Sequence, residues 1–405
     1  MKVLQINAVS GIRSTGRICV ELSDYLNENS NEGYIAYSEG NPYLKEYIIG
    51  NMIEKKIHGL SSRIFGKQAY FSKNGTKDLV AFIEKLQPDV VHLHNLHSNY
   101  INLEILLKYL ATEDIPTVLT LHDCWFFTGK CTHYTVDNCM KWINGCNNCP
   151  RLKKDNPSWF LDRTPKMYRD KKNWFNNIPR VAIVGVSDWI TREAKKSFLS
   201  DSNIITRIHN WVDLEIFKPI DTNQIKKTMD LQNKFVILGV ASIWSNEKGL
   251  EKFIELSSIL PNDMVIILVG NISITRNIPS NIIHLSETHN VYNLVEYYSL
   301  ADVLVNLSVE ETFGMVTAEA LSCGTPAIVI NSTANPELIA ENCGHIINDD
   351  NISEILNKIN MVKNKKKEFY KDNCINYAFK NFNKKDRLFD YMSLYKSLLS
   401  YKGNK

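Results

Sequence analysis

Residues 302–331 read DVLVNLSVEETFGMVTAEALSCGTPAIVIN. The apolar run 303–307 predicts a buried strand, and 327–330 predicts a second one. Between them a helix opens at 313–316 and ends before Gly324, because glycine suits a helix C-terminus. This pattern is one β-α-β unit, and its crossover is expected to be right-handed.

The turn that precedes this helix has the chemistry of an anion site. Gly314 lets the backbone approach a ligand closely, and the first N–H groups of the helix form a seat for phosphate. Glu311 lies at the edge of this seat, and Glu319 follows ~12 Å further along if the segment is all helical. A nucleotide sugar fits, with its diphosphate on the helix, its sugar near Glu311 and its ribose near Glu319. The spacing alone equally allows a buried β-α-β unit with two surface glutamates.

The full string 311–326, ETFGMVTAEALSCGTP, closely resembles the E-x7-E signature of the retaining family-4 glycosyltransferases of GT-B fold. The resemblance continues, more patchily, over most of the chain. It implies an α/β protein with two Rossmann-like domains that face each other across a cleft, and a C-terminal helix that crosses back to the first domain. It also implies a nucleotide-sugar donor, expected to be a UDP-sugar, and transfer with retention of configuration. The expected acceptor is a saccharide or a polyprenyl-pyrophosphate-linked saccharide of bacterial capsule or O-antigen synthesis.

The chain length and one connecting segment predict the domain division. A chain of 405 residues is long enough for two domains. The segment 204–219 is similar to the family's crossover between domains, although Trp211 stands where glycine is usual. We expect an N-terminal acceptor domain over 1–208 and a C-terminal nucleotide-sugar domain over 209–385. Helices are predicted at 337–341, 352–364, 366–379 and, completing the first domain, 386–405.

The composition is that of a soluble globular protein. Hydrophobic residues make up 44% and charged residues 22%, and the net charge of +3 does not demand a polyanionic partner such as nucleic acid. No apolar run approaches the ~20 residues that span a bilayer. The apolar start at 1–6 is too short for a signal peptide, so a cytoplasmic location is expected.

Two groups in the first domain follow predicted strands. A polar loop at 8–16 lies between a strand and a helix expected at 17–27; it suits an anionic group, although an ordinary polar loop has the same composition. The strand 90–94 carries His92 and His94 on one face, which allows a metal pair, but a lining of the active site is favoured. The acceptor-side candidates are Arg13, Ser14, Thr15, His94 and Asn95, and Gly16 is assigned to the donor.

His122 follows the strand 116–121, at the tip where open α/β sheets bind ligands. In the family that it resembles, the matching histidine lines the donor-sugar pocket. The alternative is a structural histidine bonded to backbone. The resemblance thus assigns catalytic roles to His122, Glu311 and Lys248.

Lys248 precedes Gly249 at a strand-to-helix turn and is similar to the family's phosphate-binding lysine. Ile243 stands where the family has an arginine, so Ser242, Trp244 or an arginine of the first domain would have to replace that group. The loop 287–291 is expected to meet the nucleotide base through its backbone. The donor-side candidates are Gly16, Ser242, Lys248, Asn290, Val291, Glu311, Thr312, Phe313, Gly314, Met315, Val316 and Glu319. No Asp-x-Asp motif is present, so catalysis is expected to need no cofactor or divalent ion.

A cysteine-rich insert occupies 124–150, and only its last pair has the spacing of a zinc ribbon. Cysteines in a reducing compartment favour thiols or metal over disulfides. A structural zinc ion is favoured, with buried thiols or an iron–sulfur site as alternatives. The zinc ligands would be Cys131, Cys139, Cys146 and Cys149.

Residues 151–176 mix lysine, arginine, tryptophan and tyrosine. Such a surface suits an anionic bilayer or a pyrophosphate-linked lipid, which allows peripheral membrane contact, although a solvated helix face is the favoured explanation for each residue alone. Nucleic acid is less supported, because no recognised module accompanies the charge.

Two rival functions remain open. A nucleotide-sugar epimerase or a phosphorylase would keep the fold but change the reaction. A zinc-stapled binding module for anionic polymers would use the cysteine insert and the basic stretch, but it would leave Lys248, Glu311 and Glu319 without a purpose.

Overall fold

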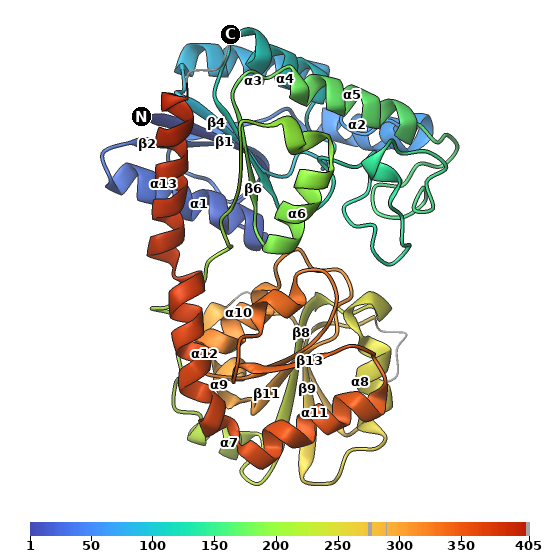
Figure 1. Cartoon of the computed structure of the whole chain (residues 1–405), viewed down its shortest axis with the longest axis vertical. Helices are drawn as coiled ribbons and strands as arrows, with labels where there is room; N and C mark the ends of the chain where they lie inside the picture. Colours follow the sequence, from blue (N-terminus) through green and yellow to red (C-terminus); the bar gives the residue numbers. More distant parts are fainter. Residues whose placement is uncertain (274–277, 289, 402–405) are drawn as a thin grey trace. The chain divides into compact units, whose positions relative to one another are not determined.

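A computed structural model describes residues 1–273, 278–288 and 290–401 of the chain. The chain forms two compact units, the first made of 1–208 with 388–405 and the second of 209–387. We call them the N-terminal and the C-terminal domain (Figure 1). Residue 289 of the expected base loop and residues 402–405 of the expected last helix lie outside the described residues.

The N-terminal domain is built on a seven-stranded parallel sheet with the strand order β3-β2-β1-β4-β5-β6-β7. Apolar residues of the inner strands are fully buried, as expected for a sheet covered on both faces. The strands are β1 (Lys2–Ser10), β2 (Glu32–Gly40), β3 (Glu46–Ile48), β4 (Val90–Leu93), β5 (Thr117–Leu121), β6 (Val181–Gly185) and β7 (Ile204–Arg207).

Helices connect and surround these strands (Figure 1). They are α1 (Arg13–Glu28), α2 (Met52–Phe65), α3 (Lys73–Leu86), α4 (Leu103–Thr112), α5 (Thr164–Asn176) and α6 (Asp188–Lys196), with 3-10 turns η1 (Lys141–Ile143) and η2 (Phe198–Asp201). The C-terminal helix α13 (Lys384–Ser400) packs into this domain through Tyr391 and Tyr395, which are fully buried.

The C-terminal domain has a six-stranded parallel sheet with the order β10-β9-β8-β11-β12-β13. Its strands are β8 (Phe235–Ile243), β9 (Met264–Asn271), β10 (Ile282–Leu285), β11 (Val303–Asn306), β12 (Ala327–Ile330) and β13 (Gly344–Ile347). Its helices are α7 (Asn223–Thr228), α8 (Leu250–Ser257), α9 (Val291–Leu300), α10 (Met315–Ser322), α11 (Ile352–Lys365) and α12 (Lys367–Phe382), with 3-10 turns η3 (Asn246–Lys248) and η4 (Asn335–Leu338).

In both sheets the strand order reverses beside the first strand of the domain. The reversal lies between β1 and β4 in the first sheet and between β8 and β11 in the second. Open α/β sheets bind ligands at this point, outside the carboxyl ends of the strands. The two doubly wound parallel sheets that the sequence predicted are therefore present, and each has one preferred place for a ligand.

Two predicted helices differ from the structure. Helix α1 begins at Arg13, not at residue 17, so the polar residues 13–16 form its first turn instead of a loop. Gly16 makes this possible, because a Cβ there would lie 3.1 Å from the Gly11 nitrogen. The helix predicted at 337–341 was wrong: only the 3-10 turn η4 forms, with Pro336 in its first turn.

Candidate functional site

The end of β8 and the end of β11 bring Lys248 and Glu311 together in the C-terminal domain. The Lys248 Nζ lies 2.5 Å from the Glu311 Oε1 and donates to the Ser308 Oγ at 3.0 Å. Both side chains are partly exposed to solvent, Lys248 by 37% and Glu311 by 20%. A cation and an anion therefore share one partly open position at the reversal of the strand order.

The start of α10 lies next to this pair in the sequence. Gly314 precedes the helix with φ +99, a conformation that a side chain would strain, and a Cβ there would approach the Leu338 Cδ1 to 3.0 Å. The first N–H groups of α10, at Met315 and Val316, have no helical partner by geometry. This arrangement is the anion seat that the sequence predicted, although its ligand stays a prediction.

The loop that carries Glu311 is held by buried polar groups. The Asn306 Oδ1 accepts from the Ser308 N–H at 3.1 Å, and the Asn335 Nδ2 donates to the Ser308 carbonyl at 2.7 Å. The Thr333 Oγ1 accepts from the Glu311 N–H at 3.0 Å. These bonds fix the backbone from which Glu311 reaches Lys248.

Glu319 is on the inner side of α10 and is only 5% exposed. The Tyr298 hydroxyl donates to its Oε2 at 2.8 Å, so the carboxylate is oriented by a residue of α9. This burial differs from the alternative in which both glutamates of the motif lie on the surface.

The other donor-side candidates are spread over the domain. Thr312 and Phe313 are buried, Met315 and Val316 are half-buried, and Ser242 is exposed. Asn290 caps α9, which begins at Val291, by accepting from the Tyr292 N–H.

Ile243 stands where the family has an arginine, and Trp244 follows it. Ile243 is 69% exposed. The suggestion that Trp244 takes over the arginine's role was wrong, because Trp244 is buried and its Nε1 donates to the Val269 carbonyl at 3.0 Å.

In the N-terminal domain, three strands place His94, His122 and Gln5 in one hydrogen-bonded chain. The Gln5 Nε2 donates to the Cys19 carbonyl, so its Oε1 faces the His94 Nε2 at 3.0 Å. The His94 Nε2 must then carry the proton, and the His94 Nδ1 accepts from the His122 Nε2 at 3.0 Å. His122 therefore carries a proton on Nε2.

Burial keeps these histidines uncharged. It lowers the pKa of His122 to about 4 and the pKa of His94 well below its usual range. His92 is also buried with a lowered pKa, and its two nitrogens bond the Tyr395 hydroxyl and the Thr120 Oγ1. His92 is thus a structural residue of the core rather than a partner of His94 in a metal pair.

The reversal of the first sheet brings Asn95 near the first turn of α1. The Asn7 Oδ1 accepts from the Asn95 N–H at 3.2 Å, and the Asn7 Nδ2 lies 3.5 Å from the Thr15 Oγ1. Arg13 and Ser14 are exposed at the same helix end. The structure therefore brings together the acceptor-side candidates of β4 and α1, whose roles stay predictions.

The four predicted zinc ligands are in a segment where only η1 is regular. The Cys131 and Cys149 sulfurs lie 3.8 Å apart, and the Gly129 N–H points at the Cys146 sulfur at 3.1 Å. Among the described residues, no three cysteine sulfurs lie within 4.8 Å of one another.

Several residues that shape both sites were not identified from the sequence. Gln5 and Asn306 carried a readable signal, since each is a polar residue in an otherwise apolar buried strand. Tyr298 and Asn335 carried none, because their partners lie 21 and 27 residues away.

Two family models together match most of the chain. The model described as Glycosyltransferase Family 4 matches residues 15–216, and the model described as Glycosyl transferases group 1 matches residues 221–381. The chain belongs to the GT-B glycosyltransferases. The matched segments follow the two domains of the structure.

Curated relatives are about a quarter identical to this glycosyltransferase over the aligned segments. The putative colanic acid biosynthesis glycosyl transferase WcaC of Escherichia coli is 24% identical over 278 residues, which cover 66% of each chain. An Escherichia coli UDP-Gal:alpha-D-GlcNAc-diphosphoundecaprenol alpha-1,3-galactosyltransferase is 28% identical over 49% of this chain and 56% of its own. The chain thus spans about half to two thirds of the length of these relatives.

Solved structures show the same fold over almost the whole chain. A glycosyltransferase from Rickettsia africae has a TM-score of 0.70 at 16% identity and covers 99% of both chains. Anabaena HepE in complex with UDP has a TM-score of 0.70 at 14% identity, covering 98% of this chain and 100% of its own.

Proposed function

We propose that this glycosyltransferase moves a sugar from a UDP-sugar to a lipid-linked saccharide, with retention of anomeric configuration, during synthesis of a bacterial surface polysaccharide. The observation that carries the proposal is the Lys248–Glu311 pair, 2.5 Å apart beside the N-terminus of α10. This position combines a cation, an anion and unpaired helix N–H groups, which are the three partners that a sugar diphosphate requires.

The pair would change partners when the donor binds. The diphosphate would take the Lys248 ammonium and the N–H groups of Met315 and Val316. Glu311, released from Lys248, would accept hydrogen bonds from the sugar hydroxyls. As the sugar leaves, negative charge grows on the diphosphate, and donors already aimed at it lower the barrier. Lys248 and the helix end would thereby stabilise the leaving diphosphate without a divalent ion.

The substrates of relatives support the substrate classes. HepE was solved with UDP and with UDP-glucose, and the galactosyltransferase from Escherichia coli uses UDP-galactose and a diphosphoundecaprenol-linked sugar. WcaC is assigned to colanic acid, a surface polysaccharide. A polyprenyl-linked acceptor would place the reaction at the inner face of the plasma membrane.

Glu319→Gln tests the proposal at the donor. We expect UDP to raise the melting temperature of the wild-type protein, since a ligand that binds only the folded state stabilises it. In Glu319→Gln the shift should be clearly smaller, because the amide replaces one of the two acceptors for the ribose hydroxyls with a donor. A scanning-fluorimetry titration with UDP measures both.

Tyr298→Phe is the matched control, since it removes only the hydroxyl that orients Glu319. Its UDP affinity should fall less than that of Glu319→Gln. Equal UDP affinity in Glu319→Gln and wild type would contradict the assigned role, and absence of any UDP shift in the wild type would contradict the proposed donor.

We also propose that the cysteine insert holds one structural zinc ion. The Cys131–Cys149 sulfur distance of 3.8 Å equals the edge of a ZnS4 tetrahedron, about 3.8 Å for Zn–S bonds of ~2.3 Å. Cys139 and Cys146 would complete the tetrahedron, which requires them to move closer than they are in the described structure. Zinc would staple a long irregular segment and take no part in sugar transfer.

Cys146→Ser should therefore lose zinc and lower the melting temperature of the N-terminal domain by several degrees, because metal-binding energy contributes directly to folding. Elemental analysis of the purified protein measures the zinc content. Cys323→Ser, in the C-terminal domain, is the matched control and should keep one zinc per chain. Wild-type protein without metal would contradict the proposal.

A further inference from the structure

Helix α2 has the reverse of the usual burial pattern. The residues that it buries are His58, Gly59 and Ser62, which are polar or small. The side chains that it exposes are apolar: Met52 (61% exposed), Ile53 (72%), Ile57 (58%), Leu60 (50%) and Phe65 (52%). A surface helix of a globular protein turns its apolar stripe towards the core, so this helix needs an apolar partner outside its own domain.

Three of the exposed side chains form one stripe along the helix. Ile53, Ile57 and Leu60 follow the spacing i, i+4 and i+7, which places them on one face of the helix. At the C-terminal end of α2 the segment 159–161 joins it, because the Trp159 N–H donates to the Arg63 carbonyl at 2.8 Å.

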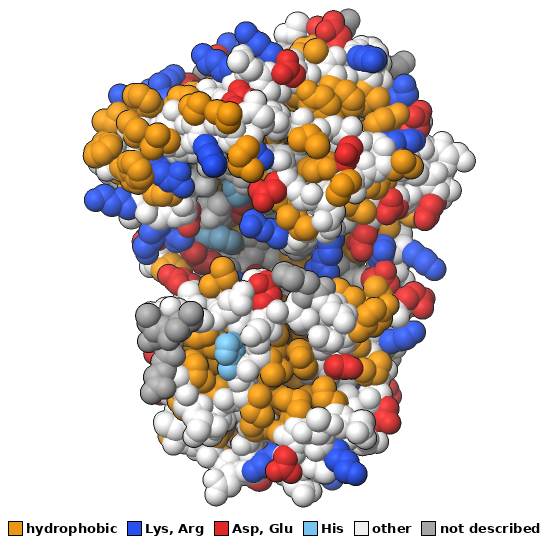
Figure 2. All heavy atoms as spheres, turned by 180° about the vertical axis from the view of Figure 1, so that it is seen from behind, with side chains coloured by type: hydrophobic (Ala, Val, Ile, Leu, Met, Phe, Trp, Pro, Cys, Tyr) orange, Lys and Arg blue, Asp and Glu red, His pale blue; other side chains and the backbone are white. Residues whose placement is uncertain are grey.

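This segment extends the apolar surface. Its residues are Trp159 (48% exposed), Phe160 (72%) and Leu161 (38%). We call the exposed apolar residues of α2 together with these three the α2 face. Figure 2 shows hydrophobic side chains gathered on the part of the N-terminal domain that carries α2, with lysine and arginine side chains around them.

Cationic residues flank the α2 face. Lys56 on the helix and Lys153, Lys154, Arg163 and Lys166 beside the 159–161 segment are exposed. Nearby carboxylates are held in the protein: Glu54 accepts from the Gly75 N–H, and Asp162 accepts from the Thr164 N–H. These cations outnumber the two carboxylates, although Lys166 is itself paired with Asp170 at 2.8 Å.

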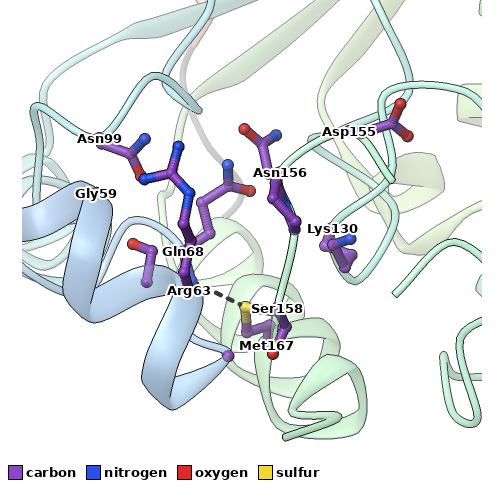
Figure 3. Close-up of a pocket in the computed structure, with 12 residues that line it drawn as sticks. Gly59, Arg63, Gln68, Asn99, Lys130, Asp155, Asn156, Ser158 and Met167 are labelled. Carbon is purple, nitrogen blue, oxygen red and sulfur yellow. Dashed lines mark hydrogen bonds between the residues drawn. The ribbon is translucent and has the colours of Figure 1, made fainter. Parts of the chain in front are cut away.

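A pocket of about 80 Å³ lies beside α2, and two cations, Arg63 and Lys130, and the Asp155 carboxylate line it. Arg63 and Gly59 of the helix line it together with Gln68, Asn99, Asn156 and Ser158. Figure 3 shows the Arg63 side chain extending towards Asn99 in this pocket. A cation in a polar recess next to an apolar face suits the phosphate of a lipid headgroup.

We propose that the α2 face docks the N-terminal domain on a bilayer that contains anionic phospholipids. The apolar side chains would enter the boundary between headgroups and acyl chains, and the cationic rim would contact the lipid phosphates. A second copy of the chain fits less well, because a symmetric dimer through this face would bring two cationic rims together. Among the described residues, no helix has both the length and the apolar character of a membrane span.

This docking surface differs from the one that the sequence suggested. Within 151–176, the aromatic residues Tyr168 and Trp174 are buried, and Lys171 is only 2% exposed. The Lys171 ammonium donates to the Trp125 and Thr128 carbonyls and lies over the Trp125 ring. Only Trp159 to Leu161 and the exposed basic residues remain available, and α2 supplies most of the apolar surface.

Vesicle flotation with the full chain tests the proposal independently of sugar transfer. Wild-type protein should bind vesicles of phosphatidylcholine with phosphatidylglycerol and should bind pure phosphatidylcholine much more weakly. Ile57→Ser with Leu60→Ser should lower the partition constant roughly ten-fold or more, because two apolar side chains no longer enter the bilayer. Lys56→Gln and Lys154→Gln should each lower it about five-fold, and this loss should disappear in high salt.

Phe379→Ser is the matched control, since it removes a phenylalanine of α12 in the C-terminal domain that is 61% exposed, about as much as Ile57 (58%). It should leave vesicle binding unchanged, and unchanged melting temperatures show that all variants fold. Wild-type protein that does not float, or an Ile57→Ser and Leu60→Ser variant that floats like wild type, would overturn the proposal. A wild-type dimer in sedimentation velocity that the same double variant dissociates would assign the face to a second copy instead. Failure here leaves the donor assignment intact, because UDP binding is measured separately.

Discussion

Lys248→Ala should reduce sugar transfer by about 100- to 1000-fold, the loss typical of removing one preorganised donor to a developing charge. Lys248 is the cation that the structure places beside the start of α10, and Ile243 offers no second one where the family has an arginine. With one cation fewer to begin with, the chain should depend on Lys248 more strongly than a relative that has both. The measurement is release of UDP from a UDP-sugar with a lipid-pyrophosphate saccharide as the acceptor.

The control for this variant is Lys252→Ala. Lys252 lies on α8, a few residues further along, and its ammonium lies 3.6 Å from a carboxylate oxygen of Asp350. Its loss should change transfer less than about two-fold.

Glu311→Gln should also impair transfer, although the lysine remains, because the amide does not balance the Lys248 charge or accept equally from the sugar. Transfer by Lys248→Ala within a few-fold of wild type would remove the physical basis of the proposed donor site.

The fold was largely predictable because its signals are local. Most inner strands of both sheets are apolar runs, and the 302–331 segment carries its own strand, turn, helix and stop signals. The errors arose where tertiary contacts decide. Helix α1 begins four residues before its predicted start because Gly16 lets it approach β1, and no side-chain cap marks its start.

Helix α2 shows a different limit of sequence reading. Its apolar residues have helical spacing, but spacing does not say whether a stripe faces the core or the outside. Only the structure shows that His58 and Ser62 take the inner positions and leave Ile53 and Ile57 exposed. The polar and apolar sides of a helix can thus be predicted, while their orientation requires the rest of the fold.

The site was predictable to the extent that one motif carries it. Glu311, Gly314 and Glu319 come from a single turn and helix, so their proximity follows from local geometry. Lys248 comes from another strand, and only the parallel pairing of β8 with β11 brings it to Glu311. Gln5, which fixes the proton position on His94, is 89 residues away from it, so its polarity within a strand is a local signal but its partner could not be read from the sequence.

The N-terminal domain should lose stability steeply as the pH falls from about 6.5 towards 4. Burial lowers the pKa of His58 and of His122 to about 4, and it lowers the pKa of His92 and His94 well below their usual range. Between these values and the unfolded pKa of about 6.5, the unfolded chain binds protons that the folded domain does not. Each such histidine lowers the free energy of unfolding by about 1.4 kcal/mol for each pH unit by which the pH falls. Together the four would remove about 5 kcal/mol per unit, comparable with the whole stability of an ordinary domain.

Calorimetry from pH 7 to pH 4.5 measures this effect, with the transitions of the two domains analysed separately because a two-domain chain is not expected to unfold in one step. The C-terminal domain is the internal control. Among the described residues, burial lowers the pKa of one histidine there, His345, against four in the N-terminal domain, so the C-terminal transition should decline much less over the same range. In His122→Asn the pH slope of the N-terminal domain should fall by about 1.4 kcal/mol per unit, since one titrating group is gone. An N-terminal transition that is independent of pH above 5 would show that these histidines bind protons in the folded domain as readily as in the unfolded chain. The conclusion that burial keeps His122 neutral would then be wrong.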